Sequence, residues 1–217
     1  MCKFCETNPV YEFTNKRKLC ERCFINYFNK KFLLGIRKYY MISKGDKIYY
    51  FESKDFKTEV LKNILNFFKS KFEIDLLGIK NKEDFLKILK KEKKENKNKI
   101  KLALNSSIDS ESQEFLNNLV YGQSDKLKNF LPVFEYQIKP LYLFLDEEIL
   151  LYGKLNHYFS NNNNNCKEKN EYPKNIDLKE SNLKMKSINQ FLNKLEKSHP
   201  EVKRAVINSL LKIENKN

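Results

Sequence analysis

The stretch Lys47-Ile48-Tyr49-Tyr50-Phe51 decides the fold class of this chain, because it predicts a buried strand at the head of an alternating pattern. Gly45-Asp46 supplies a turn directly before it. Apolar side chains then recur at helical spacing from Val60 to Phe68, and further strand-like runs occupy 74–79 and 100–104. Strands that alternate with helices of about ten to fifteen residues are typical of a parallel sheet with covering helices. The sequence therefore predicts an α/β protein.

The remainder of the chain extends this pattern toward the C-terminus. Further expected elements are helices around 85–89, 115–120 and 146–158, a strand within 135–143, and two closing helices separated by His199-Pro200. Between them, Ser160 to Lys179 is rich in Asn and charge and has no periodicity, which predicts a flexible loop.

Four of the five cysteines form two Cys-x-x-Cys pairs, Cys2/Cys5 and Cys20/Cys23, with fourteen residues between the pairs. Each such turn brings two sulfurs to one point, and tetrahedral zinc needs four soft ligands. A short hairpin around 11–13 and 18–19 would return the second pair to the first. Two disulfides are one alternative, but a cytosolic chain keeps its thiols reduced, and a redox site needs only one such pair. We predict a structural zinc knuckle with no open position for catalysis.

The residues directly after the knuckle predict an amphipathic helix with one basic face, from Phe24 to Lys38. Its apolar side is expected to pack on the main domain, which leaves the basic side available for RNA phosphates. The candidate phosphate contacts are Lys30, Lys31, Arg37 and Lys38. Tyrosines on the same segment could stack on bases, although packing in the core or an interface is the simpler interpretation for each one. They are Tyr27, Tyr39 and Tyr40.

The composition favours a polyanionic partner. The chain of 217 residues has 42 basic and 28 acidic side chains, a formal net charge of +14. Only four of the basic residues are Arg, and Asn is abundant, as expected for an AT-rich genome, so compositional drift explains part of this charge. The sequence has no apolar run of about 18 residues and no signal-peptide core at its beginning, so we predict a cytoplasmic protein without a membrane partner.

Several segments occur in an order that matches one family. After the knuckle and Leu19–Phe24 come Ile36–Tyr39, Met41–Lys47, Asp109–Leu119, Ile138–Leu141, Glu147–Tyr152 and Phe191–Pro200. In this order they resemble the archaeal and eukaryotic tRNA 2-thiolation ATP-pyrophosphatases, the TtuA-like branch of the PP-loop superfamily. The resemblance covers almost the whole chain and is most specific at its beginning.

The resemblance implies a chemistry. Members of this family adenylate the C2 carbonyl oxygen of the wobble uridine with ATP and magnesium, and sulfur from a thiocarboxylate on a ubiquitin-like protein replaces that oxygen. The ATP phosphates lie on a Ser-Gly-Gly-Lys-Asp-Ser loop between the first strand and helix, and several members hold an iron–sulfur cluster on three cysteines. The implied partners are tRNA and the sulfur carrier.

This sequence departs from the family where catalysis needs it. In an ungapped alignment the loop reads Ser53-Lys54-Asp55-Phe56-Lys57-Thr58, so both glycines are gone, Phe56 stands at the lysine and Lys57 at the aspartate. A gapped alignment keeps Lys54-Asp55 as the family's Lys-Asp pair but still lacks the glycines. Asp109 is the one aspartate kept from the family's second nucleotide motif. Outside the knuckle only Cys166 remains, too few thiols for a three-cysteine cluster.

We therefore predict a degenerate nucleotide loop at Ser53, Lys54, Asp55 and Asp109, with ATP and magnesium doubtful and no iron–sulfur cluster. The predicted role is a tRNA-binding subunit of wobble-uridine 2-thiolation, similar to the non-catalytic subunit of the eukaryotic cytoplasmic complex, paired with a catalytic paralogue or with itself. Two alternatives stay open: a reduced but active ATP-dependent tRNA thiotransferase, and a zinc-knuckle RNA-binding scaffold outside thiolation. The predicted segments are 1–40 for the knuckle and basic helix, 41–159 for a reduced PP-loop-like α/β domain, 160–180 for a flexible loop, and 181–217 for C-terminal helices.

Overall fold

A computed structural model describes residues 1–91, 99–123, 128–159, 190–192 and 194–214. Contacts within the chain divide it into two compact units, Met1–Ser107 with Pro132–Ser160, and Ile108–Leu131 with Asn161–Asn217. The first unit contains the four knuckle cysteines and the five-stranded sheet. None of the helices in the described ranges is long and apolar enough to cross a membrane.

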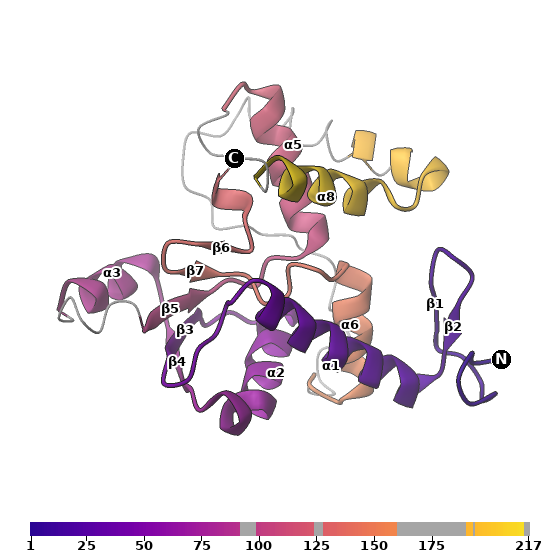
Figure 1. Ribbon diagram of the computed structural model, residues 1–217, viewed down its shortest axis with the longest axis horizontal. Helices are drawn as coiled ribbons and strands as arrows, with labels where there is room; N and C mark the ends of the chain where they lie inside the picture. Colours follow the sequence, from indigo (N-terminus) through magenta and orange to yellow (C-terminus); the bar gives the residue numbers. More distant parts are fainter. Residues whose placement is uncertain (92–98, 124–127, 160–189, 193, 215–217) are drawn as a thin grey trace. The chain divides into compact units, whose positions relative to one another are not determined.

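The first unit is built on a five-stranded sheet in the order β4-β3-β5-β7-β6 (Figure 1). Within this sheet, β3 (Lys47–Phe51) pairs in parallel with β4 (Asp75–Ile79) on one side and β5 (Ile100–Ala103) on the other. β7 (Gln137–Ile138) continues the parallel sheet, and β6 (Val133–Phe134) closes it antiparallel to β7. The predicted α/β class is confirmed, and so are the three predicted strands, which correspond to β3, β4 and β5.

The alternation of side chains along β3 gives the sheet two buried faces. Ile48 packs with α1 (Glu21–Lys38), α2 (Phe56–Phe72) and α6 (Asp146–Leu155) in the larger apolar core. Tyr49, on the other face, packs with Phe85 of α3 (Lys82–Lys91) in a second cluster. Because β3 is covered on both faces, its central residues Ile48, Tyr49 and Tyr50 are buried in succession rather than alternately exposed.

The strand predicted within 135–143 is wrong in extent. In this region the described residues form two short strands, β6 and β7, which make a hairpin around Glu135, a residue with a left-handed φ of 53°. The chain leaves the sheet after Ile138 because Pro140 has no amide hydrogen to donate, and Leu141 to Leu143 form turns.

The bounds of two helices of the second unit are α5 (Ile108–Val120) and α8 (Val202–Glu214). Phe115, Phe130 and Leu210 form its apolar cluster. The predicted break at His199-Pro200 is confirmed, since residues 194–198 are helical and α8 begins at Val202. The predicted loop at 160–180 and most of the helix before the break lie outside the described residues.

Candidate functional site: a four-cysteine centre and the turn after β3

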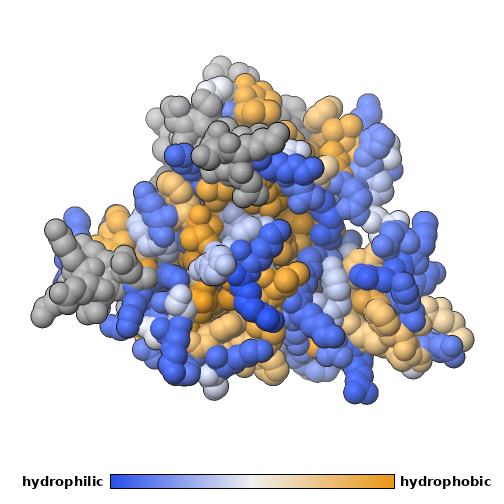
Figure 2. All heavy atoms as spheres, in the orientation of Figure 1, coloured by the Kyte–Doolittle hydropathy of each residue, from blue (hydrophilic) through white to orange (hydrophobic). Residues whose placement is uncertain are grey.

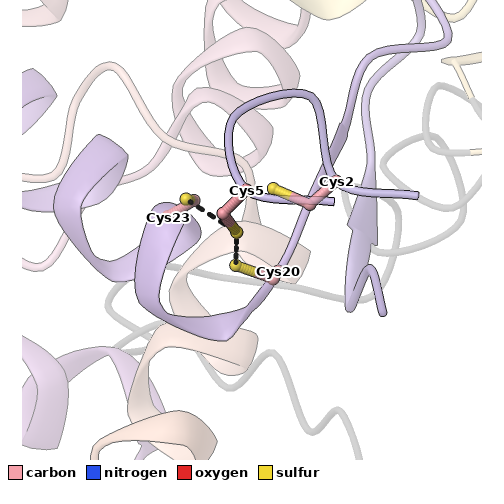
Figure 3. A group of neighbouring side chains, drawn as sticks. All are labelled: Cys2, Cys5, Cys20 and Cys23. Carbon is pink, nitrogen blue, oxygen red and sulfur yellow. Dashed lines mark hydrogen bonds between the residues drawn. The ribbon is translucent and has the colours of Figure 1, made fainter. Parts of the chain in front are cut away.

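The four knuckle cysteines converge on one point (Figure 3). Their sulfur atoms all lie within 4.8 Å of one another, and Cys5 Sγ is 3.2 Å from Cys20 Sγ. The hairpin of β1 (Tyr11–Glu12) and β2 (Lys18–Leu19) brings the two pairs together, as predicted. Tetrahedral zinc with bonds of about 2.3 Å separates its sulfurs by about 3.8 Å, so these residues could hold a metal ion.

The environment of the thiols is uneven. Cys2 and Cys20 are buried, whereas Cys5 is exposed. Hydrogen bonds from the Thr7 hydroxyl and from the backbone of Cys23 lower the pKa of Cys20 to about 6, which favours the thiolate. Burial and the neighbouring cysteines raise the pKa of Cys23 to about 12. Four neighbouring thiols cannot all ionise without a cation between them, so the donor set suits a metal ion.

The first turn of α6 holds the knuckle against the sheet domain. Tyr11 of the hairpin donates a hydrogen bond from its hydroxyl to Glu147 Oε1 at 2.7 Å. Glu148 is fully buried and accepts hydrogen bonds from Tyr27 at 3.2 Å and Lys31 Nζ at 3.1 Å, both on α1. Phe28 of α1 stacks on Phe144 and on Tyr152 of α6, with ring centroids 3.9 and 4.0 Å apart. The cysteine centre is thus attached through aromatic packing and buried polar contacts.

The predicted phosphate contacts do not share one environment. Lys30, Arg37 and Lys38 are exposed on α1. Lys31 instead points to Glu148, with its side chain 16% exposed. Figure 2 shows hydrophilic side chains interspersed with apolar ones on the face that α1 presents in Figure 1. The basic side of the helix is therefore made of three exposed cations and one that is paired inside.

The tyrosines proposed for stacking also differ. Tyr40 is 85% exposed and has a left-handed φ of 50° directly after α1. Tyr39 is half-buried beneath Lys38, whose Nζ lies 5.2 Å from its ring centroid. Tyr27 is half-buried and hydrogen-bonded to Glu148. Of the three, only Tyr40 presents most of its ring to solvent.

The turn after β3 forms a closed polar network around Asp55. This carboxylate caps α2, accepting hydrogen bonds from Thr58 N at 2.9 Å and Thr58 Oγ1 at 2.7 Å. Ser53 donates to Asp55 as well, and Asn105, which follows β5, donates from Nδ2 at 3.2 Å. Burial alone would raise the pKa of Asp55, but these donors outweigh it and lower the pKa. Asp55 is therefore held as an anion at the start of α2.

Lys57 forms a second closed contact in the first turn of α2. Its residue is only 8% exposed, and Nζ lies 2.8 Å from Asp146 Oδ1 and 3.1 Å from Ser107 Oγ. Asp146 also accepts a hydrogen bond from Ser107. The ammonium group is thus neutralised within the chain by the first residue of α6.

Ser53 and Asp55 of the predicted nucleotide loop are in direct contact, whereas Lys54 is exposed. Asp109 belongs to the second unit, where its Oδ1 is 2.6 Å from Lys203 Nζ. Sequence analysis missed Asn105, Ser107 and Asp146 as partners in this region. Asn105 and Ser107 follow the predicted strand 100–104, which ends at the same edge of the sheet as β3, so their position could have predicted this contact. No nearby residue indicated that Asp146 would join them.

The fold and the site together define the chain as a parallel α/β protein with an N-terminal four-cysteine centre. No protein-family model matches the chain, and no curated protein matches it. Among solved structures it is similar to the U34-tRNA thiolase NcsA from Methanococcus maripaludis with its [4Fe-4S] cluster, with a TM-score of 0.66 and 16% sequence identity. The match covers 98% of this chain and 86% of that one, so the two proteins share a fold over nearly their full length.

Proposed function

We propose that this protein takes part in the 2-thiolation of wobble uridine in tRNA, as a cytoplasmic tRNA-binding subunit that does not itself activate ATP. The observation that carries the proposal is the shared fold with a U34-tRNA thiolase over 98% of the chain. The four-cysteine centre and the order of the sequence motifs support the same assignment.

The metal in the cysteine centre is proposed to be zinc. Two Cys-x-x-Cys turns that supply all four ligands are typical of structural zinc, and such a closed site leaves no position for a substrate. A cysteine-ligated iron–sulfur cluster uses the same donors, so metal analysis of protein purified without oxygen must decide. We expect zinc without iron. Stoichiometric iron with visible absorbance would overturn the assignment of zinc and show that the cysteines hold an iron–sulfur cluster.

The tRNA contact is proposed to lie on α1 through Lys30, Arg37 and Lys38. Their exposed charges can neutralise phosphates and release counterions. Lys31 contributes less than we expected from sequence, because its ammonium group is already paired with buried Glu148. Replacing each exposed cation with Gln should weaken tRNA binding and reduce its salt dependence by about one unit of slope.

The loss of ATP activation is supported by the two closed contacts after β3. A nucleotide phosphate at the start of α2 would need the amide of Thr58, which already donates to the Asp55 carboxylate. The phosphate would also lie against that carboxylate and be repelled by it. A magnesium ion would meet the Lys57 ammonium group where the family has an aspartate. These two contacts support the proposal that the chain does not bind a magnesium nucleotide at this turn.

Isothermal titration with magnesium ATP tests this part directly. We expect no heat of binding at millimolar nucleotide and no release of pyrophosphate in the presence of tRNA. Binding together with pyrophosphate release would favour the reduced but active thiotransferase.

The decisive test of the whole proposal is mass spectrometry of tRNA nucleosides after depletion of the protein from its host. We expect loss of wobble 2-thiouridine, because an intact paralogue would lack its tRNA-binding subunit. The same cells should yield that paralogue, or a second copy of this chain, when the tagged protein is purified, and the ubiquitin-like sulfur carrier is a further expected partner. Unchanged 2-thiouridine would contradict the proposal and favour an RNA-binding scaffold.

A further inference from the structure

Arg17 lies at the end of the hairpin turn that carries the second cysteine pair. The turn is tight: Phe13 N donates to Arg17 O at 2.8 Å, and Lys16 has a left-handed φ of 65°. The guanidinium carbon of Arg17 lies 4.2 Å from the centroid of the Phe13 ring and 5.5 Å from that of Tyr27. The backbone and the side chain are therefore both held in one place before any ligand arrives.

The guanidinium group has no carboxylate partner among the described residues. Its Nε is fully buried without a hydrogen-bond partner, and it is the one side-chain nitrogen of Arg17 that is so enclosed. Two other cations of the hairpin and α1 differ, because Lys18 is paired with Glu12 at 3.1 Å and Lys31 with Glu148 at 3.1 Å. The guanidinium group of Arg17 thus lies over an aromatic ring, and its terminal nitrogens remain available to an anion.

The choice of residue is also informative in this chain. Only four of 42 basic residues are Arg, and three of these, Arg17, Arg22 and Arg37, lie within the hairpin and α1. Lys would serve as well wherever a solvated charge is enough. A guanidinium group differs because it can stack on an aromatic ring while its fork donates two parallel hydrogen bonds to the oxygens of a phosphate.

We propose that Arg17 binds a phosphate of the RNA backbone, so that the knuckle hairpin as well as α1 contacts the RNA. This inference rests on the proposed tRNA-binding function and extends its surface to a residue of the knuckle. The contact with the Phe13 ring holds the guanidinium group in place, so little side-chain entropy is lost when the phosphate binds. The hairpin contact would be absent from a protein that uses the cysteine centre only to complete its fold.

The test measures the affinity of the full-length, metal-loaded protein for a labelled tRNA transcript with uridine at position 34, over a range of salt concentrations. The wild type is compared with Arg17→Gln, Arg17→Lys and the matched control Arg204→Gln. We expect Arg17→Gln to bind about tenfold more weakly near 0.1 M salt and to lower the salt slope by about one. Arg17→Lys should keep the salt slope of the wild type, because its charge remains. It should lose part of the affinity, because a lysine cannot make the bidentate contact. Arg204→Gln should bind as the wild type does.

The outcomes separate this inference from the function beneath it. If the wild type binds the transcript and Arg17→Gln binds equally well, Arg17 only covers the aromatic cluster, and the inference is overturned while the proposed function stands. If the wild type itself does not bind, both fail. Metal content and the unfolding temperature of each variant identify a damaged knuckle. If Arg17→Gln loses metal, the tRNA affinity of Arg17→Lys decides the question. We expect a partial loss of affinity in Arg17→Lys, and wild-type affinity in that variant would overturn the inference.

Discussion

Polar side chains converge both at the cysteine centre and at the turn after β3, but only at the turn do they pair with one another. Around Asp55 and Lys57, anions face donors and a cation, so every strong contact is made within the chain. At the centre, four thiols of the same kind face one another. Four thiolates need an external cation to balance their charge, whereas a set that contains anions, hydrogen-bond donors and a cation can pair within the chain.

This difference indicates what each region is for. Polar groups that cannot pair with one another are typical of a site that binds a ligand, and the four cysteines are such a group. Groups that form hydrogen bonds and ion pairs with one another stabilise the fold, and these contacts compete with a ligand for the same atoms. The first turn of α6 joins the two regions, since Asp146 pairs with Lys57 while Glu147 and Glu148 hold the hairpin and α1.

Breaking the cysteine centre should have the largest effect. We expect Cys20→Ser to lose the proposed metal and to lower the free energy of unfolding by more than about 3 kcal/mol, since a metal held by these ligands couples its binding to the folding of the knuckle. Metal analysis and denaturant unfolding measure both quantities. Cys166→Ser is the control and should keep the metal. Retention of a full complement of metal in Cys20→Ser would show that the centre is not a four-ligand site.

The contact of α6 with α1 should follow in size. Glu148→Ala removes the carboxylate that pairs with Lys31 and accepts the amide of Leu145, and we expect a loss of about 3 kcal/mol because Glu148 is fully buried. Glu147→Ala is the neighbouring control. It loses one exposed hydrogen bond from Tyr11 and should cost less than about 1 kcal/mol. Equal effects in urea unfolding would mean that burial of Glu148 does not matter.

The closed contact at Lys57 should be sensitive to the removal of one partner alone. Asp146→Ala leaves the ammonium group poorly hydrated, and we expect a loss of about 2 kcal/mol, moderated because the Asp146 side chain is 28% exposed. The double variant Lys57→Met with Asp146→Leu should recover most of this stability, because it buries no charge. Failure of the double variant to recover would indicate that the pair fits its site in a way apolar groups cannot replace.

The smallest expected effect concerns Asp55 and depends on pH. Asp55→Ala should cost about 1 kcal/mol at neutral pH through loss of the cap on α2. The pKa of Asp55 is lowered in the folded chain below the value of about 3.9 of an unfolded chain, so its contribution is complete above that value and is lost as pH falls through the folded pKa. Unfolding measured from pH 7 downward should show the two proteins converging in acid. A difference that persists in acid would contradict a role for the charge.

Much of the fold could be read from local patterns. Strands β3, β4 and β5, the helices between them and the cysteine hairpin were predicted because their signals lie within a few residues of one another. The strand expected at 135–143 failed because its apolar residues, such as Leu141 and Tyr142, are buried in turns rather than in a ladder. Apolar content reports burial, and the hydrogen-bond pattern that distinguishes a strand depends on the partner strand.

The sequence by itself determined the α/β class, the four-cysteine ligand set and the basic character of α1, because each depends on residue type and short-range spacing. Only the tertiary structure decided the use of individual charges. Lys31 and Lys57 look like solvated cations in the sequence, yet Glu148 and Asp146 neutralise them from 117 and 89 residues further along the chain. Arg17 has no such partner among the described residues. A charge is available to a ligand only when folding brings no opposite charge to it, and local sequence carries no record of that distant neighbour.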